Sequence, residues 1–240
     1  MNLEIGRRNN SSKRCGRNFV PTLLLVFALA LPLAATEKYL IAGRPDGIAL
    51  LAPPPVPGSA EQAADLASAR SVFKKRTRAE EQRAFKDASL SVFSFAEAIG
   101  PIFQPGKLPR TETFFDKLKG ELKDAVNVPK DYWKRPRPYQ LDARLSLGKP
   151  EDSFSYPSGH STRGTVQALL LAELFPDHCE GILEVGRNIG WDRVLIGKHF
   201  PTDIYAGRVL GQAIVREMKN NPHFQNDFAE VKAEVDAARR

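Results

Sequence analysis

The sequence predicts an all-α protein built as a single compact helical bundle domain. Apolar residues recur at helical spacing through most of the chain after residue 59, and no segment alternates apolar and polar residues as a half-buried strand does. Proline and glycine interrupt this pattern at intervals that suit short loops between helices. A length of 240 residues is enough for one domain with one large hydrophobic core.

The first 35 residues differ from the rest and predict a secretory signal peptide. Basic residues at positions 7–17 precede an apolar run at 19–33, which is followed by Ala34 and Ala35. A membrane anchor is the alternative, but the run contains two prolines and is shorter than the roughly 20 residues that a spanning helix needs. We therefore expect cleavage after Ala35, a periplasmic or secreted protein, and no membrane insertion of the processed chain.

The composition argues against two other classes of protein. Removal of residues 1–35 takes away five Lys/Arg and one Glu, so the formal net charge falls from +7 to +3 and gives no reason to expect a nucleic-acid partner. Cys179 would be the one cysteine left, which excludes an intrachain disulfide. Stability must then come from the hydrophobic core.

A proline-rich leader at 36–58 is expected to be extended and to lie over the surface, and the helical domain is expected at 59–240. Ser59 suits a helix N-cap, and residues 59–100 predict two helices, the second ending at Gly100. The residues expected on their apolar faces are Ala64, Leu66, Ala67, Val72 and Phe73 in the first, and Phe85, Leu90, Val92, Phe93, Phe95 and Ala96 in the second. Further helices are predicted at 111–126, 161–174, 181–196, 202–219 and 224–240.

The first polar cluster is the basic stretch 130–138. Lys130 and Arg137 are seven residues apart, so on one helix they would lie on the same side and converge on one anion, and Pro138 would stop that helix. Arg suits this task because its planar fork can meet two phosphate oxygens at once. The residues between them, Trp133, Lys134 and Arg135 among them, would face elsewhere. An exposed loop with solvated charges is the alternative.

The second cluster is the turn Pro157-Ser158-Gly159-His160, which opens into an apolar helix. The first N–H groups of a helix lack intrahelical partners and lie at its positive end, so Ser158 and Gly159 can bind an anion. His160 suits a general acid, because its reference pKa of about 6.5 keeps both protonation states available. A plain helix N-cap is the alternative.

The third cluster contains Arg193, His199 and Asp203. Glycines mark a thin helix face that lets this helix approach its neighbours while Arg193 points into the site: Gly186, Gly190 and Gly197. Asp203 is expected in the first turn of the next helix, where it can accept a hydrogen bond from one nitrogen of His199 and leave the other free to attack phosphorus. A purely structural His–Asp pair is the alternative. The remaining histidines, His178 and His223, are expected at the surface.

At these residues the chain resembles the type 2 phosphatidic acid phosphatase superfamily, whose pattern Lys-x6-Arg-Pro, Pro-Ser-Gly-His, Arg-x5-His-x3-Asp it matches at every fixed position. Within that superfamily it is most similar to the bacterial class A non-specific acid phosphatases. The resemblance implies the helical fold shared with vanadium haloperoxidases, small phosphomonoester substrates, no metal or other cofactor, and the homo-oligomers common among relatives.

The resemblance also implies a role for each site residue. His199 would form a phosphohistidine intermediate, Asp203 would hold and polarise it, and His160 would protonate the leaving alcohol and then activate water. The residues that would bind the non-bridging oxygens are Lys130, Arg137, Ser158, Gly159 and Arg193. The chain departs from the family at Asp192, where relatives often have Ser; this carboxylate is expected to weaken anion binding or to engage Arg193.

Three other functions stay open at this point. The first is a lipid phosphate or diphosphate phosphatase, although such relatives usually carry several spanning helices. The second is a vanadium-dependent haloperoxidase with vanadate in the phosphate position, although those chains are usually much longer. The third is a phosphate-binding protein without catalysis, which would not need His199 and Asp203 opposite His160.

Overall fold

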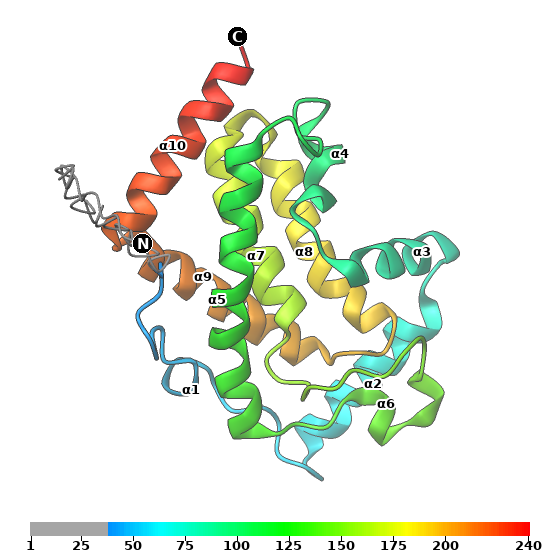
Figure 1. Cartoon of the computed structure of the whole chain (residues 1–240). Coiled ribbons are helices and arrows are strands. Elements are labelled where there is room, and N and C mark those ends of the chain that lie inside the picture. The colour runs from blue at the N-terminus through cyan, green and yellow to red at the C-terminus, as the bar shows by residue number, and fades with distance from the viewer. Residues whose placement is uncertain (1–37) are drawn as a thin grey trace, which may run out of the picture. The chain divides into compact units, whose positions relative to one another are not determined.

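The computed structural model describes residues 38–240, which form helices and contain no β-strand (Figure 1). The expected signal peptide, residues 1–35, lies outside this part. The α-helices are α1 (Gly47–Leu50), α2 (Ala60–Lys75), α3 (Arg78–Lys86), α4 (Ala96–Ile99), α5 (Pro109–Trp133), α6 (Pro138–Leu141), α7 (Gly159–Leu174), α8 (Cys179–Leu195), α9 (Pro201–Lys219) and α10 (Pro222–Ala238). The 3₁₀ turns are η1 (Asp87–Ser89), η2 (Val92–Phe95), η3 (Ala143–Leu145) and η4 (Pro176–His178). The all-α prediction is confirmed.

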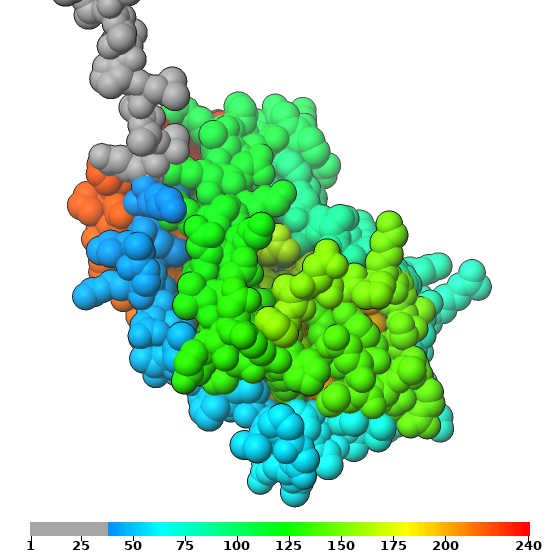
Figure 2. Space-filling model, turned by 60° about the horizontal axis from the view of Figure 1, so that its bottom comes forward, coloured from blue at the N-terminus to red at the C-terminus, as the bar shows by residue number. Residues whose placement is uncertain are grey.

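The helices after residue 109 follow the sequence pattern closely. The bounds of α7, α8, α9 and α10 lie within two residues of those predicted, whereas α5 extends beyond its predicted range at both ends and includes Pro129. None of the helices within residues 38–240 combines the length and apolar character needed to cross a membrane. The loop between η3 and α7, yellow-green in Figure 2, lies beside α5.

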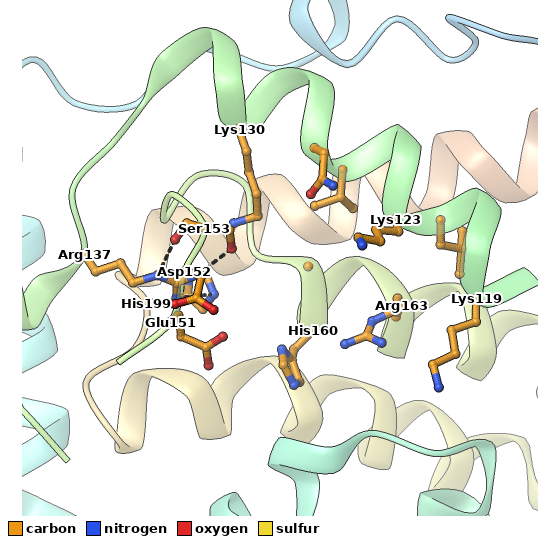
Figure 3. A pocket seen from close by; sticks show the side chains of 14 residues that line it. Lys119, Lys123, Lys130, Arg137, Glu151, Asp152, Ser153, His160, Arg163 and His199 are labelled. Atoms are coloured by element: carbon orange, nitrogen blue, oxygen red, sulfur yellow. Dashed lines mark hydrogen bonds between the residues drawn. The ribbon is translucent and has the colours of Figure 1, made fainter. Parts of the chain in front are cut away.

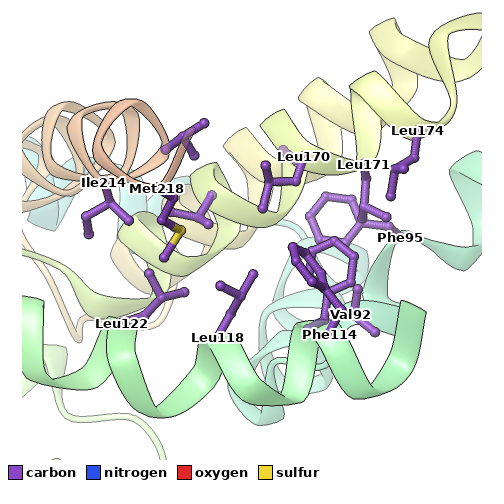
Figure 4. Packing of buried hydrophobic residues seen from close by; sticks show 14 of the residues in the cluster. Val92, Phe95, Phe114, Leu118, Leu122, Leu170, Leu171, Leu174, Ile214 and Met218 are labelled. Atoms are coloured by element: carbon purple, nitrogen blue, oxygen red, sulfur yellow. The ribbon is translucent and has the colours of Figure 1, made fainter. Parts of the chain in front are cut away.

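The core is centred on α7, which packs against α8 and α9 and is crossed by α5. Figure 4 shows Leu118 and Leu122 of α5 facing Leu170 of α7 and Ile214 of α9, and all four are buried. A fully buried leucine contributes about 1.5–3 kcal/mol relative to an exposed one. This contact fixes α5 against α7, and with it the position of Lys130 near the end of α5.

Glycines allow α7 and α8 to approach closely. A Cβ atom added at Gly186 would lie 2.5 Å from the Cβ of Ala168, and one at Gly190 would lie 3.0 Å from the Oγ of Ser161. The predicted thin helix face is therefore confirmed at these two positions. Gly197 is not part of it, because α8 ends at Leu195 and Gly197 follows with a positive φ of 69°.

Residues 78–100 differ from the single helix that was predicted there. α3 ends at Lys86, and of the predicted apolar residues that follow, Leu90 lies between η1 and η2, and the others lie in η2 and α4. η2 buries Val92 and Phe95 in the core without a continuous helix, because a 3₁₀ turn also returns every third side chain to the same side. The predicted end at Gly100 is confirmed as the C-cap of α4.

α2 begins as predicted, since the Oγ of Ser59 accepts a hydrogen bond from the backbone N–H of Gln62 at 3.1 Å. Its buried face was predicted only in part. Gln62, Asp65 and Ala69 are buried, and Leu66 and Val72 of the predicted stripe pack against the small apolar cluster that contains Ala69. The polar members of this face pair with Arg135 in the loop after α5 and with Thr202 in the first turn of α9.

The segment 38–58 also differs from the expected surface leader. Tyr39, Leu40 and Leu51 are buried in the main core, and the backbone N–H groups of Tyr39 and Leu40 donate to the carboxylate of Glu121 on α5 at 2.8–3.1 Å. α1 forms one helical turn after Asp46, whose side chain caps it. This segment therefore helps to hold α5 in place.

Candidate active site

A cavity of about 440 Å³ lies between α5, the loop before α7, and the start of α7. Its lining includes five residues expected at the phosphate site: Lys130, Arg137, Gly159, His160 and His199. The other three expected residues, Ser158, Arg193 and Asp203, are almost fully buried beside these. The sequence clusters thus meet at one cavity.

Lys130 and Arg137 converge, but not from one helix as predicted. α5 ends at Trp133, Lys134 adopts the left-handed conformation with φ of 48°, and Pro138 begins α6 instead of stopping α5. Both side chains reach the backbone carbonyl of Phe154 in the loop before α7, with Arg137 Nη2 at 3.3 Å. Figure 3 shows them pointing to the same place from different elements.

Burial changes the acid–base behaviour of Lys130. Desolvation first, and then the nearby Arg137 charge, lower the pKa of its ammonium group to about 7, with partial opposition from Asp203, Glu151 and Asp131. Within residues 38–240, its donors meet only backbone carbonyl oxygens, those of Phe154 and Ser155. The ammonium group is thus held at the cavity wall without a carboxylate bonded to it.

The turn before α7 places Ser158 as the helix N-cap. Its Oγ accepts from the N–H of Ser161 at 3.3 Å, and its own N–H donates to the carbonyl of Asp203 at 3.0 Å. Ser158 is fully buried and does not line the cavity, whereas Gly159 and His160 do. As the first residues of α7, these two have backbone N–H groups without acceptors in the helix, which suits them to an anion.

His199 lies in the loop after α8, and its backbone N–H donates to the carbonyl of Arg193 at 3.2 Å. Its Nδ1 lies 3.1 Å from Oδ2 of Asp203, in the first turn of α9. Its Nε2 lies 3.2 Å from Nη1 of Arg137, which can only donate, so Nε2 is the acceptor and Nδ1 bears the proton. His199 therefore directs an unprotonated nitrogen toward the cavity cations.

The same surroundings keep His199 neutral. Burial first, and then the charges of Arg137, Lys130 and Arg193, lower the pKa of its imidazole well below the usual value. A neutral imidazole with a free lone pair is the form that can attack an electrophile. The carboxylate of Asp203 lies where it can stabilise the positive charge that this attack would create.

Arg193 is almost fully buried and only partly paired. Its Nη2 donates to the carboxylate of Glu151, whereas its Nε and Nη1 have no hydrogen-bond partner among the described residues. Buried guanidinium donors without partners are costly, so they are suited to an anion that enters the cavity. Burial is also the main cause that lowers the pKa of Arg193.

His160 is fixed by a backbone contact. Its Nε2 lies 3.1 Å from the carbonyl of Ala88, which can only accept, so Nε2 bears a proton and Nδ1 is the nitrogen left for chemistry. Burial, and then the charges of Arg193 and Arg163, lower the pKa of His160 well below its usual value. A bound phosphate dianion would oppose these charges and favour the protonated imidazole.

Arg135 is a site residue that the sequence analysis missed; it was expected to face elsewhere. It is buried, with Nη1 donating to Asp203 Oδ1 at 2.6 Å and Nη2 donating to Asp65 Oδ2 at 2.7 Å and Gln62 Oε1 at 3.0 Å. Its guanidinium group also lies 4.0 Å from the ring centre of Phe200. No local sequence signal pointed to Arg135, because Asp65 and Asp203 lie 70 and 68 residues away.

Asp192 does not pair with Arg193, so that alternative is wrong, whereas a weakening of anion binding by Asp192 stays a prediction. Its fully buried carboxylate accepts two hydrogen bonds from Arg83 of α3, at 2.7 and 3.0 Å. Nearby, burial and the Asp192 charge raise the pKa of Asp87 to about 6. This carboxylate therefore ties α3 to α8.

His178 and His223 are exposed, as predicted. Within residues 38–240, no group of three or more His, Cys, Asp or Glu side chains is arranged to hold a metal ion.

Comparison with known proteins gives the family. The family model described as the PAP2 superfamily matches residues 122–226. A solved structure, the transmembrane PAP2 type phosphatidylglycerolphosphate phosphatase from Bacillus subtilis, covers 72% of this chain and 89% of its own, with a TM-score of 0.48 and 24% identity.

The sequence relatives are closer. An acid phosphatase from Zymomonas mobilis subsp. mobilis is 30% identical over 203 residues, which cover 81% of this chain and 77% of the relative. A non-specific acid phosphatase from Providencia stuartii is 30% identical over 199 residues, which cover 79% of this chain and 80% of the relative. With the family match and the clustered motif residues, these relatives show that the chain belongs to the PAP2 superfamily and is a phosphatase.

Proposed function

We propose that the protein is an exported acid phosphatase that hydrolyses small phosphate monoesters through a phosphohistidine intermediate, without a metal ion. The observation that carries this proposal is the orientation of His199. Its protonated Nδ1 is held by Asp203, and its unprotonated Nε2 accepts from Arg137 at the cavity. A nucleophile needs this arrangement, and a simple anion-binding site does not.

In the first step, the lone pair on Nε2 of His199 attacks phosphorus and forms an N–P bond while the ester P–O bond breaks. The leaving alkoxide takes a proton from Nδ1 of protonated His160. Lys130, Arg137 and Arg193 neutralise the non-bridging oxygens, whose charge is then held by groups that need little reorganisation.

In the second step, neutral His160 takes a proton from water, and the resulting hydroxide oxygen attacks phosphorus. The N–P bond breaks, its electrons return to Nε2 of His199, and inorganic phosphate leaves. Asp203 stabilises the charged imidazole between the two steps and need not change its own protonation. Each proton and electron pair is thereby returned, so the cycle can repeat.

The test is hydrolysis of p-nitrophenyl phosphate by the purified protein in excess EDTA, with His199→Ala and the exposed-histidine control His178→Ala alongside. We expect rapid turnover in the wild type and in the control, and a loss of at least about 10⁴-fold in His199→Ala. Turnover that survives in His199→Ala would refute the nucleophile, and turnover abolished by EDTA would refute metal independence.

Rapid quenching of the wild-type reaction during turnover distinguishes hydrolysis through a covalent phosphoenzyme from direct attack of water on the substrate. Phosphate bound to histidine is labile in acid and stable in alkali, so we expect an alkali-stable phosphoprotein that His199→Ala lacks. Activity on micellar lipid phosphates without activity on soluble esters would favour the lipid phosphatase. Export is supported by the sequence pattern at 1–35, and N-terminal sequencing of the processed protein tests it.

A further inference from the structure

A groove leads away from the expected phosphate site. Lys119, Lys123 and Arg163 line the same cavity as His199. A second cavity of about 260 Å³ shares Lys119 and Arg163 with the first and continues to residues 89–93. In Figure 3, Arg163 and Lys119 lie beyond His160 as seen from His199. The groove therefore begins on the side of the site where His160 stands.

The three cations of this groove have no partners. Within residues 38–240, Lys119, Lys123 and Arg163 form no hydrogen bond or ion pair, whereas Lys117 on the same helix pairs with Asp227 at 3.0 Å. Arg163 is partly buried, and burial is the first cause that lowers its pKa, opposed by the Glu151 charge. A desolvated guanidinium group without a partner favours an anion from outside the protein.

Among residues 38–240, the acidic side chains that line the groove form no ion pair with its three cations, although the Glu151 charge acts on Arg163. Glu151 lines the first cavity and is paired with Arg193, and Asp152 lies beside it. Asp116 and Glu112 line the second cavity, where Glu112 accepts a hydrogen bond from the N–H of Gly106 at 2.5 Å. None of these carboxylates contacts Lys119, Lys123 or Arg163 closely enough for an ion pair.

The position of His160 connects the groove to the reaction. Arg163 follows His160 by three residues on α7, so the two side chains lie on one face of the helix, and the Arg163 charge acts on the His160 ring. If His160 protonates the leaving alcohol, that alcohol lies on the side of Arg163. Lys119 and Lys123, one turn apart on α5, face the same space.

We propose that Lys119, Lys123 and Arg163 form a second anion subsite, which binds a phosphate or carboxylate group on the leaving alcohol of the substrate. The proposal rests on the proposed function and narrows its substrate class to phosphomonoesters whose alcohol bears another anionic group. The subsite acts in binding, so it raises kcat/KM for such esters without a new chemical step.

Three esters with one six-carbon chain test this. They are the monophosphate of hexane-1,6-diol, the corresponding bisphosphate, and 6-phosphonooxyhexanoate, which end in a hydroxyl, a phosphate and a carboxylate. Initial phosphate release gives kcat/KM for each, halved for the bisphosphate because its two phosphates are equivalent. We expect kcat/KM for the bisphosphate to exceed kcat/KM for the hydroxyl-ended ester by about tenfold, and the value for the carboxylate-ended ester to lie between them.

The variants identify the groups responsible. We expect the bisphosphate-to-hydroxyl ratio to fall to about twofold or less in Lys119→Met/Lys123→Met and to fall also in Arg163→Gln. Lys107→Met removes the same charge from an exposed loop outside both cavities and should leave the ratio unchanged. Because the two rates come from one preparation, any loss of folded protein cancels from the ratio.

The outcomes separate the two proposals. A ratio near one in the wild type, or a ratio that the variants leave unchanged, would overturn the second subsite while turnover of the hydroxyl-ended ester still supports the phosphatase function. If the bisphosphate is preferred over the hydroxyl-ended ester and the carboxylate-ended ester is not, the subsite is restricted to phosphate groups. If none of the three esters is hydrolysed, both the proposed function and the subsite are overturned.

Discussion

Arg135 and Asp203 form a buried ion pair in which Arg135 Nη1 donates to Asp203 Oδ1 at 2.6 Å. This leaves Oδ2 for His199, for the N–H of Phe200 at 2.9 Å and for the hydroxyl of Ser155 at 2.5 Å. Arg135 therefore determines which carboxylate oxygen faces the nucleophile. It is a positioning residue, because it acts on the reaction through Asp203.

Replacement of Arg135 should lower catalysis more than binding. We expect Arg135→Met to lower kcat by roughly 10- to 100-fold, as for other groups that orient a reacting residue. It should also lower the free energy of unfolding by about 3–5 kcal/mol, because Asp65 and Asp203 lose a buried partner. Steady-state kinetics and urea unfolding measure the two effects.

The matched variant is Arg135→Lys, which keeps the charge. We expect it to restore part of kcat, while KM stays close to the wild-type value in both variants. An increase in KM with unchanged kcat would show that Arg135 serves substrate binding and would contradict the positioning role.

Glu151 occupies the guanidinium group of Arg193 and should compete with substrate. The Glu151 carboxylate and a phosphate dianion compete for the one positive charge of Arg193, so we expect Glu151→Gln to lower the inhibition constant of inorganic phosphate about three- to tenfold. Inhibition of p-nitrophenyl phosphate hydrolysis measures this constant. The control is Asp152→Asn, which removes an equal charge from the same cavity lining without touching the pair. Equal effects of both variants would mean that only general charge matters.

The lowered pKa of Lys130 predicts that the affinity of the site for anions falls in neutral and alkaline solution. Its pKa is about 7 in the free protein, so the ammonium group is charged below pH 7 and loses its proton above it. We expect inhibition by sulfate, which does not titrate in this range, to weaken by up to about tenfold per pH unit above pH 7. Sulfate inhibition constants between pH 5 and 9 measure this.

The variant Lys130→Arg separates Lys130 from other titrating groups. Its guanidinium group stays charged throughout the range, so the decline in sulfate affinity above pH 7 should disappear. Persistence of the same decline in Lys130→Arg would assign it to another residue. Loss of affinity at all pH values would show only that the longer side chain does not fit.

Gly186 should tolerate no side chain. The added Cβ would lie 2.5 Å from the Cβ of Ala168, so Gly186→Ala must separate α7 from α8. We expect the free energy of unfolding to fall by about 1–3 kcal/mol. The control on the same helix is Gly181→Ala, whose Cβ meets only Ala98 at an ordinary 3.5 Å and should stabilise the protein by about 0.5–1 kcal/mol. Urea denaturation measures both, and equal stability of the two variants would contradict the close approach.

Much of the fold could be predicted because its signals are local. α7 to α10 have regular apolar spacing and clear starts, such as the Pro201 that opens α9. The prediction was wrong at residues 87–95 because Val92 and Phe95 satisfy a helical spacing while lying in the short turn η2. Apolar spacing reports that side chains are buried, and it does not distinguish one continuous helix from several turns.

The site residues likewise divide into those with a local sequence signal and those without one. Five of the eight expected residues line one cavity and the other three are buried beside them, because their spacing brings each to the end of a helix or the adjoining loop. Arg135 escaped prediction because its partners lie far away in the sequence, 70 residues for Asp65 and 68 for Asp203. No local pattern encodes such a pair, and only the packing of α2 against α9 reveals it.

Most of the groove wall and the reacting groups belong to different parts of the chain, although Arg163 shares α7 with His160, and this separation affects how the enzyme can evolve. His160, Arg193 and Asp203 belong to α7, α8 and α9, whose contacts leave little room for change. The groove wall instead includes exposed side chains of α5 and the turns at 89–93. Mutational libraries confined to that wall should therefore yield altered substrate ranges at small cost in folding, whereas libraries in the helix contacts should yield mostly inactive proteins.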